Sequence, residues 1–198
     1  MITVHHRNNS RSQRILWLLE ELGMRYEIKR YQRDPWTMLA PPELRRIHPL
    51  GKPPVITDGE ITLAESGAVV EYLADRHGAG RLIPAHATPQ RLRCNYRPHR
   101  AEGSAMPPLL LMLVFRRVES APAPFFVKPV ARGIARKVLQ GSVDPQLRLQ
   151  VGYLEGELAR GGLDDANYPR LSSFLRRIHD RPAYQRVLQR GAEYKLGS

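Results

Sequence analysis

Two short strands and one helix are predicted in the first thirty residues. Ile2 to His6 is an apolar, strand-like run that ends in a polar turn. Apolar residues then recur at helical spacing and stop at Gly23, as at a helix end: Ile15, Leu16, Leu18, Leu19 and Leu22. Tyr26 to Tyr31 alternates enough for a second strand. Because a helix connects the two strands, we expect them to be parallel.

A β-hairpin follows, in which the apolar runs Val55–Thr57 and Ile61–Leu63 flank Asp-Gly-Glu. Ser66 is a plausible N-cap for the next helix, whose apolar face comprises Ala68, Val69, Tyr72 and Leu73. Pro42 to Ile47 could form a short helix before the hairpin. The resulting order of strands and helices is that of an α/β thioredoxin-like domain, which we place at residues 1–78.

The rest of the chain reads as helices. Residues 79–89 are rich in Gly and Pro and are expected to be a linker. Five helical patterns follow in residues 90–198: Gln90 to Val118, Pro124 to Leu139, Pro145 to Ala159, Tyr168 to Arg181, and Pro182 to Arg190. Pro98 and Pro107-Pro108 should kink or interrupt the first. We therefore expect an all-α C-terminal domain at residues 90–198.

The positive charge lies in the second half of the chain. The net charge is +12, yet residues 1–78 hold 11 Lys/Arg against 10 Asp/Glu. A basic half can attract nucleic acid or acidic metabolites. Since no nucleic-acid motif accompanies the charge, we favour an ordinary solvated face.

Cysteine content and hydropathy indicate the cellular compartment of the protein. Cys94 is the single cysteine, which excludes an internal disulfide and a cysteine-rich metal site and fits a reducing compartment. The most apolar run, Leu109 to Phe115, is shorter than the roughly 18 residues of a membrane span. With no secretory leader visible at Met1, we expect a cytoplasmic protein without a membrane partner.

Three motifs in fixed order resemble the glutathione-binding half of the cytosolic glutathione transferases. They are Gly51-Lys52-Pro53-Pro54-Val55, Glu65-Ser66-Gly67-Ala68 and Glu71-Tyr72-Leu73. Ala101 to Ser104 and Arg176 to Tyr184 are most similar to a bacterial group related to fungal transferases. The resemblance implies a homodimeric detoxification enzyme that uses glutathione as co-substrate, attacks a small-molecule electrophile and needs no metal.

One departure from the family is large. Its members have a core helix opened by a Ser/Thr-x-x-Asp cap before the penultimate helices, and such a cap contributes on the order of 1 kcal/mol. Here about nine residues, without that motif, separate Leu158 from Tyr168. Either the helix has been lost or the numbered chain omits it.

Ser10 is the candidate for activating the thiol of glutathione. A hydroxyl at a helix start can donate a hydrogen bond to a thiolate and lower the thiol pKa. Serine-type members of the family place their catalytic hydroxyl at the spacing seen between Ser10 and Arg14. Asn8, Asn9 and Ser12 are rivals, and Ser10 or Ser12 could simply cap the helix.

The resemblance also assigns the residues that bind glutathione. Glu65 would pair with the γ-glutamyl ammonium, while Ser66 and its helix N-terminus would bind the adjoining carboxylate. Lys52 would meet the glycyl carboxylate, and Asn9 is a further candidate contact. The alternatives are that Ser66 only caps the helix and that Lys52 is merely solvated.

Pro54 resembles the family's cis-proline, which turns the backbone so that the preceding residue pairs with the cysteinyl backbone of glutathione. That preceding residue is Pro53, which has no N–H. One of two expected main-chain hydrogen bonds is therefore lost, at a cost of about 1 kcal/mol.

The electrophile pocket and the overall activity are less specific. Met106 and Leu110 are pocket candidates on the helical side, although both could equally belong to a core. Glutathione-dependent peroxidase or disulfide reductase activity is a second possibility, and a non-catalytic transferase-like binding module is a third. His5, His6 and His48 are not spaced as metal ligands, and Cys94 is not at a helix start.

Overall fold

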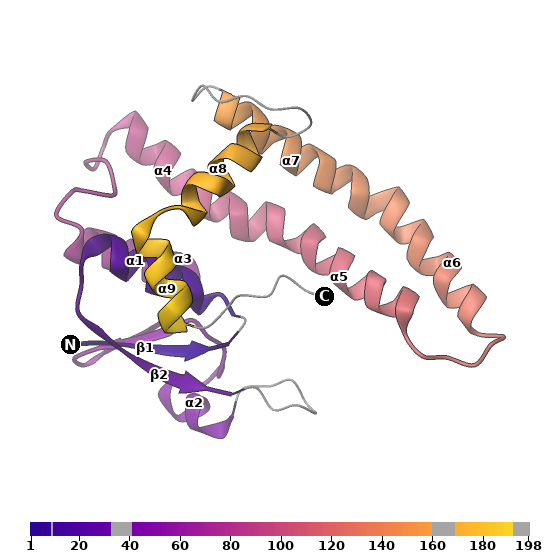
Figure 1. Ribbon diagram of the computed structural model, residues 1–198, viewed down its shortest axis with the longest axis horizontal. Helices are drawn as coiled ribbons and strands as arrows, with labels where there is room; N and C mark the ends of the chain where they lie inside the picture. The colour runs from indigo at the N-terminus through magenta and orange to yellow at the C-terminus, as the bar shows by residue number, and fades with distance from the viewer. Residues whose placement is uncertain (9, 33–40, 160–168, 192–198) are drawn as a thin grey trace. The chain divides into compact units, whose positions relative to one another are not determined.

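The computed structural model describes residues 1–8, 10–32, 41–159 and 169–191. They form two compact units (Figure 1). The first unit is Met1–Leu92 together with the chain from Ile178 onward, and the second is Arg93–Arg177. The last helix therefore belongs with the thioredoxin-like half, whereas the sequence placed it in the helical domain.

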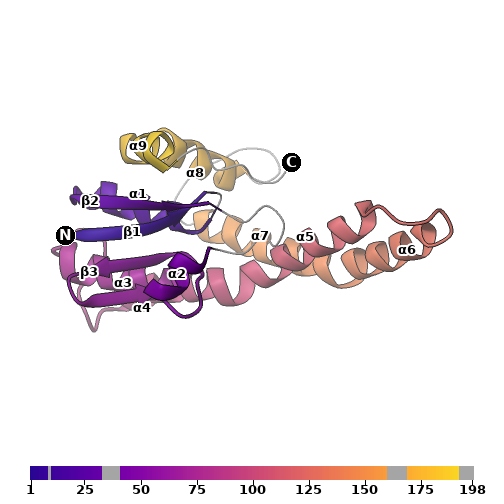
Figure 2. The ribbon, with the colours of Figure 1, turned by 90° about the horizontal axis from the view of Figure 1, so that it is seen from below.

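A four-stranded mixed sheet forms the centre of the first unit. Its strands are β1 (Ile2–Arg7), β2 (Tyr26–Tyr31), β3 (Val55–Asp58) and β4 (Ile61–Ala64). The order across the sheet is β2-β1-β3-β4, and β1 lies between β2 and β3 in Figure 2. The β1–β2 pair is parallel and the other two pairs are antiparallel, as the connecting helix and the hairpin predicted.

Helices cover both faces of this sheet, with α2 on one side and α1, α3 and α9 on the other (Figure 1). Their bounds are α1 (Ser12–Leu22), α2 (Pro42–Ile47), α3 (Ser66–His77) and α9 (Pro182–Gly191). Successive strand residues point to opposite faces. Ile56 accordingly joins the larger apolar core beneath α1 and α3, and Val55 joins the smaller cluster with Leu44 of α2. This is the predicted thioredoxin-like architecture.

Apolar contact and ion pairs hold α9 against α1. Val187 of α9 is buried in the larger core. Glu20 accepts hydrogen bonds from Arg186 Nε at 2.6 Å and from Arg190 Nη1 at 2.7 Å. Glu21 accepts one from Arg181 Nη2 at 2.6 Å. The C-terminal helix thus completes a core built by the first ninety residues.

In the part of it that the structure describes, the second unit consists of helices, with a non-helical connection at residues 121–127. Its elements are α4 (Pro89–Arg100, which begins in the first unit), the π-helical segment η1 (Ala101–Ala105), α5 (Met106–Ser120), α6 (Lys128–Val138), the π-helical segment η2 (Leu139–Val143), α7 (Asp144–Ala159) and α8 (Pro169–His179). The predicted helical patterns are therefore present. The region in which the family's core helix was sought, residues 160–168, lies outside the described residues.

Prolines in this unit are accommodated by wider helical turns. Pro98 lies inside α4, which nevertheless continues to Arg100. The π-helical segment η1 then separates α4 from α5, and Pro107 falls in the first turn of α5, where no backbone N–H is needed. The predicted interruption takes the form of a π-bulge, so the chain remains helical from α4 through α5.

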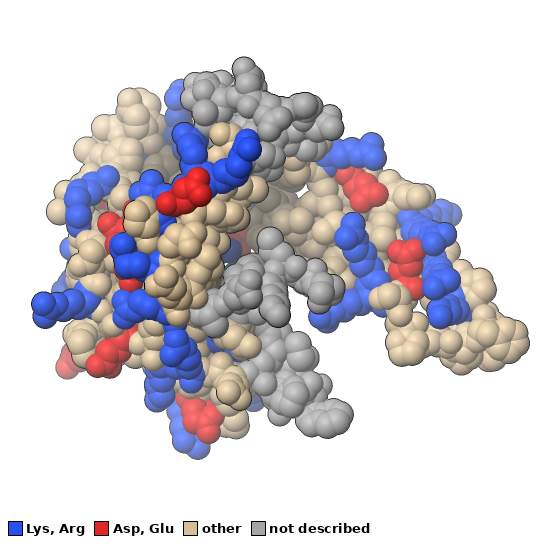
Figure 3. Space-filling view, viewed as in Figure 1, with Lys and Arg blue, Asp and Glu red and all other residues tan. Residues whose placement is uncertain are grey.

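Basic side chains are dispersed. On the face shown in Figure 3, Lys and Arg alternate with acidic and uncharged side chains and do not form one unbroken field. This distribution fits the interpretation of a solvated basic face. Among the helices of the described residues, none has the length and apolar character that crossing a membrane demands.

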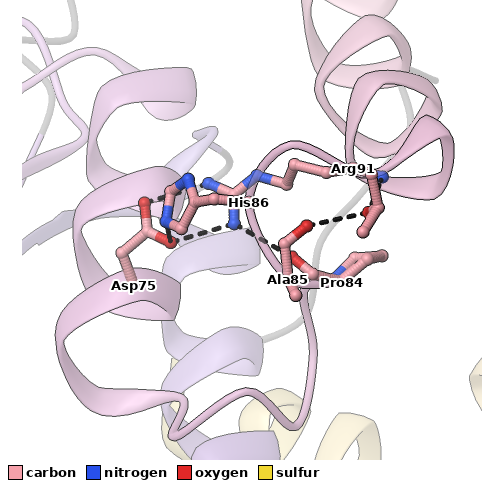
Figure 4. Close-up of polar contacts among 6 residues, drawn as sticks. Asp75, Pro84, Ala85, His86 and Arg91 are labelled. Atoms are coloured by element: carbon pink, nitrogen blue, oxygen red, sulfur yellow. Dashed lines mark hydrogen bonds and ion pairs between the residues drawn. The ribbon is translucent and has the colours of Figure 1, made fainter.

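An ion pair fixes the segment between α3 and α4 to α3 (Figure 4). Arg91 donates two hydrogen bonds to the Asp75 carboxylate, both at 3.0 Å, and another to the Pro84 carbonyl at 3.4 Å. The bond from Arg91 holds the pKa of Asp75 below its usual value. This segment, which the sequence predicted to be a linker, is anchored again at Arg81, whose Nη2 donates to the Leu22 carbonyl at the end of α1 at 2.9 Å.

Arg91→Met should lower the free energy of unfolding by about 1–2 kcal/mol at neutral pH. A bidentate hydrogen bond between an arginine and a carboxylate is one of the stronger hydrogen-bonding interactions in proteins. Because Asp75 is partly exposed, solvent screening reduces the contribution of this ion pair to stability. The deficit should shrink as pH falls through the lowered pKa of Asp75, because protonation abolishes the pair in the parent as well. Urea unfolding at several pH values measures the loss of stability, with Arg93→Met, which changes an exposed arginine, as control. A loss of stability that is the same at every pH would contradict the prediction.

Candidate active site

The turn between β1 and α1 places Ser10 at one end of the sheet. Its side chain is only 7% exposed, and its Oγ lies 2.6 Å from the Arg7 carbonyl oxygen and 2.6 Å from Ser12 Oγ. Arg11, whose side chain makes no capping bond, is the N-cap of α1. Ser10 Oγ nevertheless accepts a hydrogen bond at 3.4 Å from the backbone N–H of Ser12, the first residue of α1, so Ser10 also contributes to capping the helix start, the alternative to a catalytic role.

Behind Ser10 the polar contacts continue into the core. Ser12 is fully buried, and its Oγ lies 2.8 Å from Nδ1 of His6. His6 is 2% exposed, and its Nε2 lies 2.8 Å from the carbonyl oxygen of Gly191 at the end of α9. Burial lowers the pKa of His6, with a further lowering by Arg30, while the bond to Gly191 acts in the opposite direction. His6 is thus neutral at physiological pH.

Ser10 also lines a cavity of about 230 Å³. The other lining residues come from the N-cap of α1, from α1 itself and from α9; they are Arg11, Gln13, Arg14, Trp17 and Tyr184. The rings of Trp17 and Tyr184 meet edge to face with their centroids 5.4 Å apart. The cavity therefore combines a hydroxyl, two guanidinium groups and two aromatic rings, a lining suited to a molecule with both a negative charge and an apolar part.

The N-terminus of α3 holds a hydroxyl that lacks a partner. Ser66 is 4% exposed, and its Oγ makes no hydrogen bond to any described residue. Glu65, not Ser66, is the N-cap of α3. Its backbone φ is 73°, a value that residues other than glycine rarely adopt. The prediction that Ser66 caps the helix is therefore wrong. A buried hydroxyl beside the free N–H groups of a helix start is equipped to bind an anion.

The third segment of the site is the turn that leads into β3. The Pro53-Pro54 peptide bond is cis. Gly51 has a φ of +56°, and a Cβ there would lie 2.7 Å from the Arg45 side chain, so the turn requires glycine. Lys52 is exposed beside it. Pro53 can offer a carbonyl oxygen but no N–H to a ligand.

The sheet register brings these three segments to one end of the sheet. His5 of β1 pairs with Val55 of β3, and Val55 pairs in turn with Ala64 of β4. Pro54 immediately precedes Val55, and Glu65 immediately follows Ala64. The C-terminal end of β1, which leads into the turn that carries Ser10, lies at the same end of the sheet.

Other expected site residues are not joined to this group. Asn9 lies outside the described residues. Met106 and Leu110 lie on α5 in the second unit, where Leu110 is exposed. Their pocket role stays a prediction. In the described ranges no three His, Cys, Asp or Glu residues gather as metal ligands, and Cys94 is a free thiol.

Sequence reasoning missed two parts of the site. Gln13 and Trp17 could have been found, since both share one helical face with Arg14. Tyr184 could not, because nothing local indicates that α9 packs on α1. The partnership of His6 with Ser12 was missed for the same reason: it depends on how the turn folds back, and His6 had been considered only as a metal ligand.

Comparison with known proteins identifies the family. Residues 1–75 match the model of the glutathione S-transferase N-terminal domain. Glutathione S-transferase 1 of Saccharomyces cerevisiae is 33% identical over 166 residues, which cover 81% of this chain and 70% of the yeast protein. Among solved structures, a glutathione S-transferase from Actinobacillus pleuropneumoniae is 30% identical with a TM-score of 0.65, covering 96% of this chain and 93% of its own.

A more distant structure has a similar fold. It is a glutathione transferase family member from Pseudomonas fluorescens Pf-5 with two glutathione molecules bound, 20% identical with a TM-score of 0.72, and the match covers 94% of this chain and 92% of that one. The relatives are named as transferases, and nothing in these comparisons favours a peroxidase or a non-catalytic module. The thioredoxin-like sheet, the cis-proline turn and these similarities together show that the chain belongs to the glutathione S-transferase family.

Proposed function

We propose that this protein transfers the thiolate of glutathione to a small, apolar electrophile. The observation that carries the proposal is the buried Ser66 hydroxyl, which lies without a partner at the start of α3. A hydroxyl in such a place costs stability unless a ligand satisfies it. The γ-glutamyl carboxylate of glutathione is a ligand of the right charge for this helix N-terminus.

Each end of glutathione then has a candidate partner. Glu65 pairs with the γ-glutamyl ammonium and Lys52 with the glycyl carboxylate, while the Pro53 carbonyl accepts from the cysteinyl N–H. Ser10 donates to the sulfur and stabilises its thiolate form, and proximity to the electrophile supplies much of the remaining rate. Asn9, Met106 and Leu110 retain their proposed contacts with glutathione or the electrophile.

Calorimetric titration with reduced glutathione tests the proposal. We expect saturable binding of one glutathione per chain, followed by turnover of a small apolar aryl halide. Structures of similar proteins with glutathione bound support the expectation that glutathione binds. Absence of binding at millimolar glutathione would overturn the proposal.

We further propose a cytoplasmic homodimer active in detoxification, and sedimentation equilibrium tests its oligomeric state.

Pro53→Ser should tighten glutathione binding by about 1 kcal/mol, roughly fivefold. The substitution restores a backbone N–H beside Pro54, so the cysteinyl carbonyl of glutathione gains a donor. Calorimetry compares this variant with Pro49→Ser, which changes an exposed proline of the preceding turn and should leave the affinity unchanged. Equal affinity of Pro53→Ser and the parent protein would refute the assigned backbone contact.

A further inference from the structure

A chain of buried polar groups leads inward from Ser10, and the proposed function leaves most of it unused. Ser10 Oγ and Ser12 Oγ are 2.6 Å apart, and Ser12 Oγ lies 2.8 Å from Nδ1 of His6. Nε2 of His6 lies 2.8 Å from the Gly191 carbonyl oxygen. The chain thus connects the cavity to an imidazole that solvent does not reach.

Counting protons fixes the direction of these bonds when His6 is neutral. A carbonyl oxygen only accepts, so the ring proton of His6 is on Nε2, facing Gly191. Nδ1 must then accept, which uses the single hydroxyl proton of Ser12. Ser10 Oγ lies 2.6 Å from Ser12 Oγ, whose proton is already committed, and 2.6 Å from the Arg7 carbonyl oxygen, so the single Ser10 proton is shared between these two acceptors. The Ser12 hydroxyl therefore points toward His6. Ser10 Oγ, which accepts one bond from the Ser12 backbone N–H at 3.4 Å, keeps a second lone pair for an incoming donor.

We propose that His6 takes up the thiol proton of glutathione through Ser12 and Ser10. The S–H bond breaks as its proton moves to Ser10 Oγ, the Ser10 proton moves to Ser12 Oγ, and the Ser12 proton moves to Nδ1 of His6. The electron pair stays on sulfur. All three hydrogen bonds are then reversed, so that Ser10 donates to the new thiolate. This inference rests on the proposed function, and it makes His6 and Ser12 positioning residues for Ser10.

The groups around His6 shift its pKa in opposite directions. His6 starts neutral, because burial and the charge of Arg30 on the adjoining strand disfavour the imidazolium. The Gly191 carbonyl opposes that effect and holds the ring in the tautomer whose Nδ1 can accept. The Arg7 carbonyl, 2.6 Å from Ser10 Oγ, accepts a hydrogen bond from Ser10 while no glutathione is bound. After the thiolate reacts, His6 returns its proton outward to solvent.

Ser12→Ala tests the chain, because it breaks the connection and leaves Ser10 and His6 in place. The thiolate absorbance of bound glutathione should titrate about one pH unit higher than in the parent protein, giving roughly tenfold less thiolate near neutrality. Thr57→Val is the matched control. It removes a hydroxyl 3.4 Å from Nε2 of the neighbouring buried His5, whose Nδ1 contacts Tyr31. The control should titrate like the parent, and so would Ser12→Ala if the inference were wrong.

Nitrogen NMR of the histidine rings gives an independent measurement. Glutathione should protonate Nδ1 of His6, whereas S-methylglutathione, which fills the same site without a thiol proton, should leave it unprotonated. If glutathione binds as a thiolate while His6 stays neutral, the inference fails and the proposed function stands. If neither ligand binds in a calorimetric titration, the proposed function fails and this inference with it.

Discussion

Ser10→Ala should lower the rate of glutathione conjugation roughly ten- to hundredfold at neutral pH, because a hydrogen bond to an anion is worth about 1.5–3 kcal/mol. Ser10 is the residue at the end of β1 that joins the cavity to the buried polar chain. Its loss removes the donor to the thiolate, so the pKa of the bound thiol rises and less thiolate is present at neutral pH.

The pH profile separates this effect from a general loss of structure. Raising the pH ionises the thiol without assistance, so the activity of Ser10→Ala should approach that of the parent under alkaline conditions. Ser10→Thr, which keeps a hydroxyl at the same position, serves as the control and should retain most of the activity. Stopped-flow kinetics with an aryl halide measures all three proteins, and parallel pH profiles for Ser10→Ala and the parent would rule out thiol activation by Ser10.

Ser66→Ala should change binding and stability in opposite directions. Glutathione affinity should fall roughly tenfold or more, because the carboxylate loses a donor worth about 1.5–3 kcal/mol. The unliganded protein, however, should become more stable by about 1 kcal/mol, since the variant no longer buries an unsatisfied hydroxyl. Such a trade-off is expected of a binding group and not of a structural one.

Calorimetry and urea unfolding measure the two effects on the same samples. Ser120→Ala is a useful contrast, because that hydroxyl is exposed and already donates to the Arg116 carbonyl at 3.0 Å. It should leave glutathione affinity unchanged and should not raise stability. If Ser66→Ala lowered affinity and stability together, Ser66 would be a structural residue and the main support for the proposed function would be lost.

Local patterns were enough to predict the elements of the sheet. The strand alternation, the Asp58-Gly59 turn and the apolar stripe of α1 each depend on neighbours within a few residues, and the structure confirms all three. The identity of the cap of α3 was not predictable in this way. Ser66 has the composition of an N-cap, but the left-handed backbone of Glu65 moves the helix start by one residue, and that conformation depends on the whole turn.

Long-range contacts account for the rest of what the sequence did not show. The hydrogen bond from His6 to Gly191 joins residues 185 positions apart, so no local pattern reports it. A helix was predicted at Pro182 to Arg190, yet nothing indicated that Val187 packs into the core of the sheet. Family resemblance located Ser10, Glu65 and Ser66, whereas the chain behind Ser10 required coordinates.

The position of α9 has a consequence for how this chain is made. A ribosome delivers the strands and α1 first, and domains synthesised in this order generally fold as they emerge. Here the core beneath α1 lacks Val187 until α9 has been synthesised. Glu20 likewise lacks its ion-pair partners Arg186 and Arg190 until then. The nascent thioredoxin-like half must therefore persist with exposed apolar surface until the helical half has been translated, which makes it the part of the chain most in need of a chaperone.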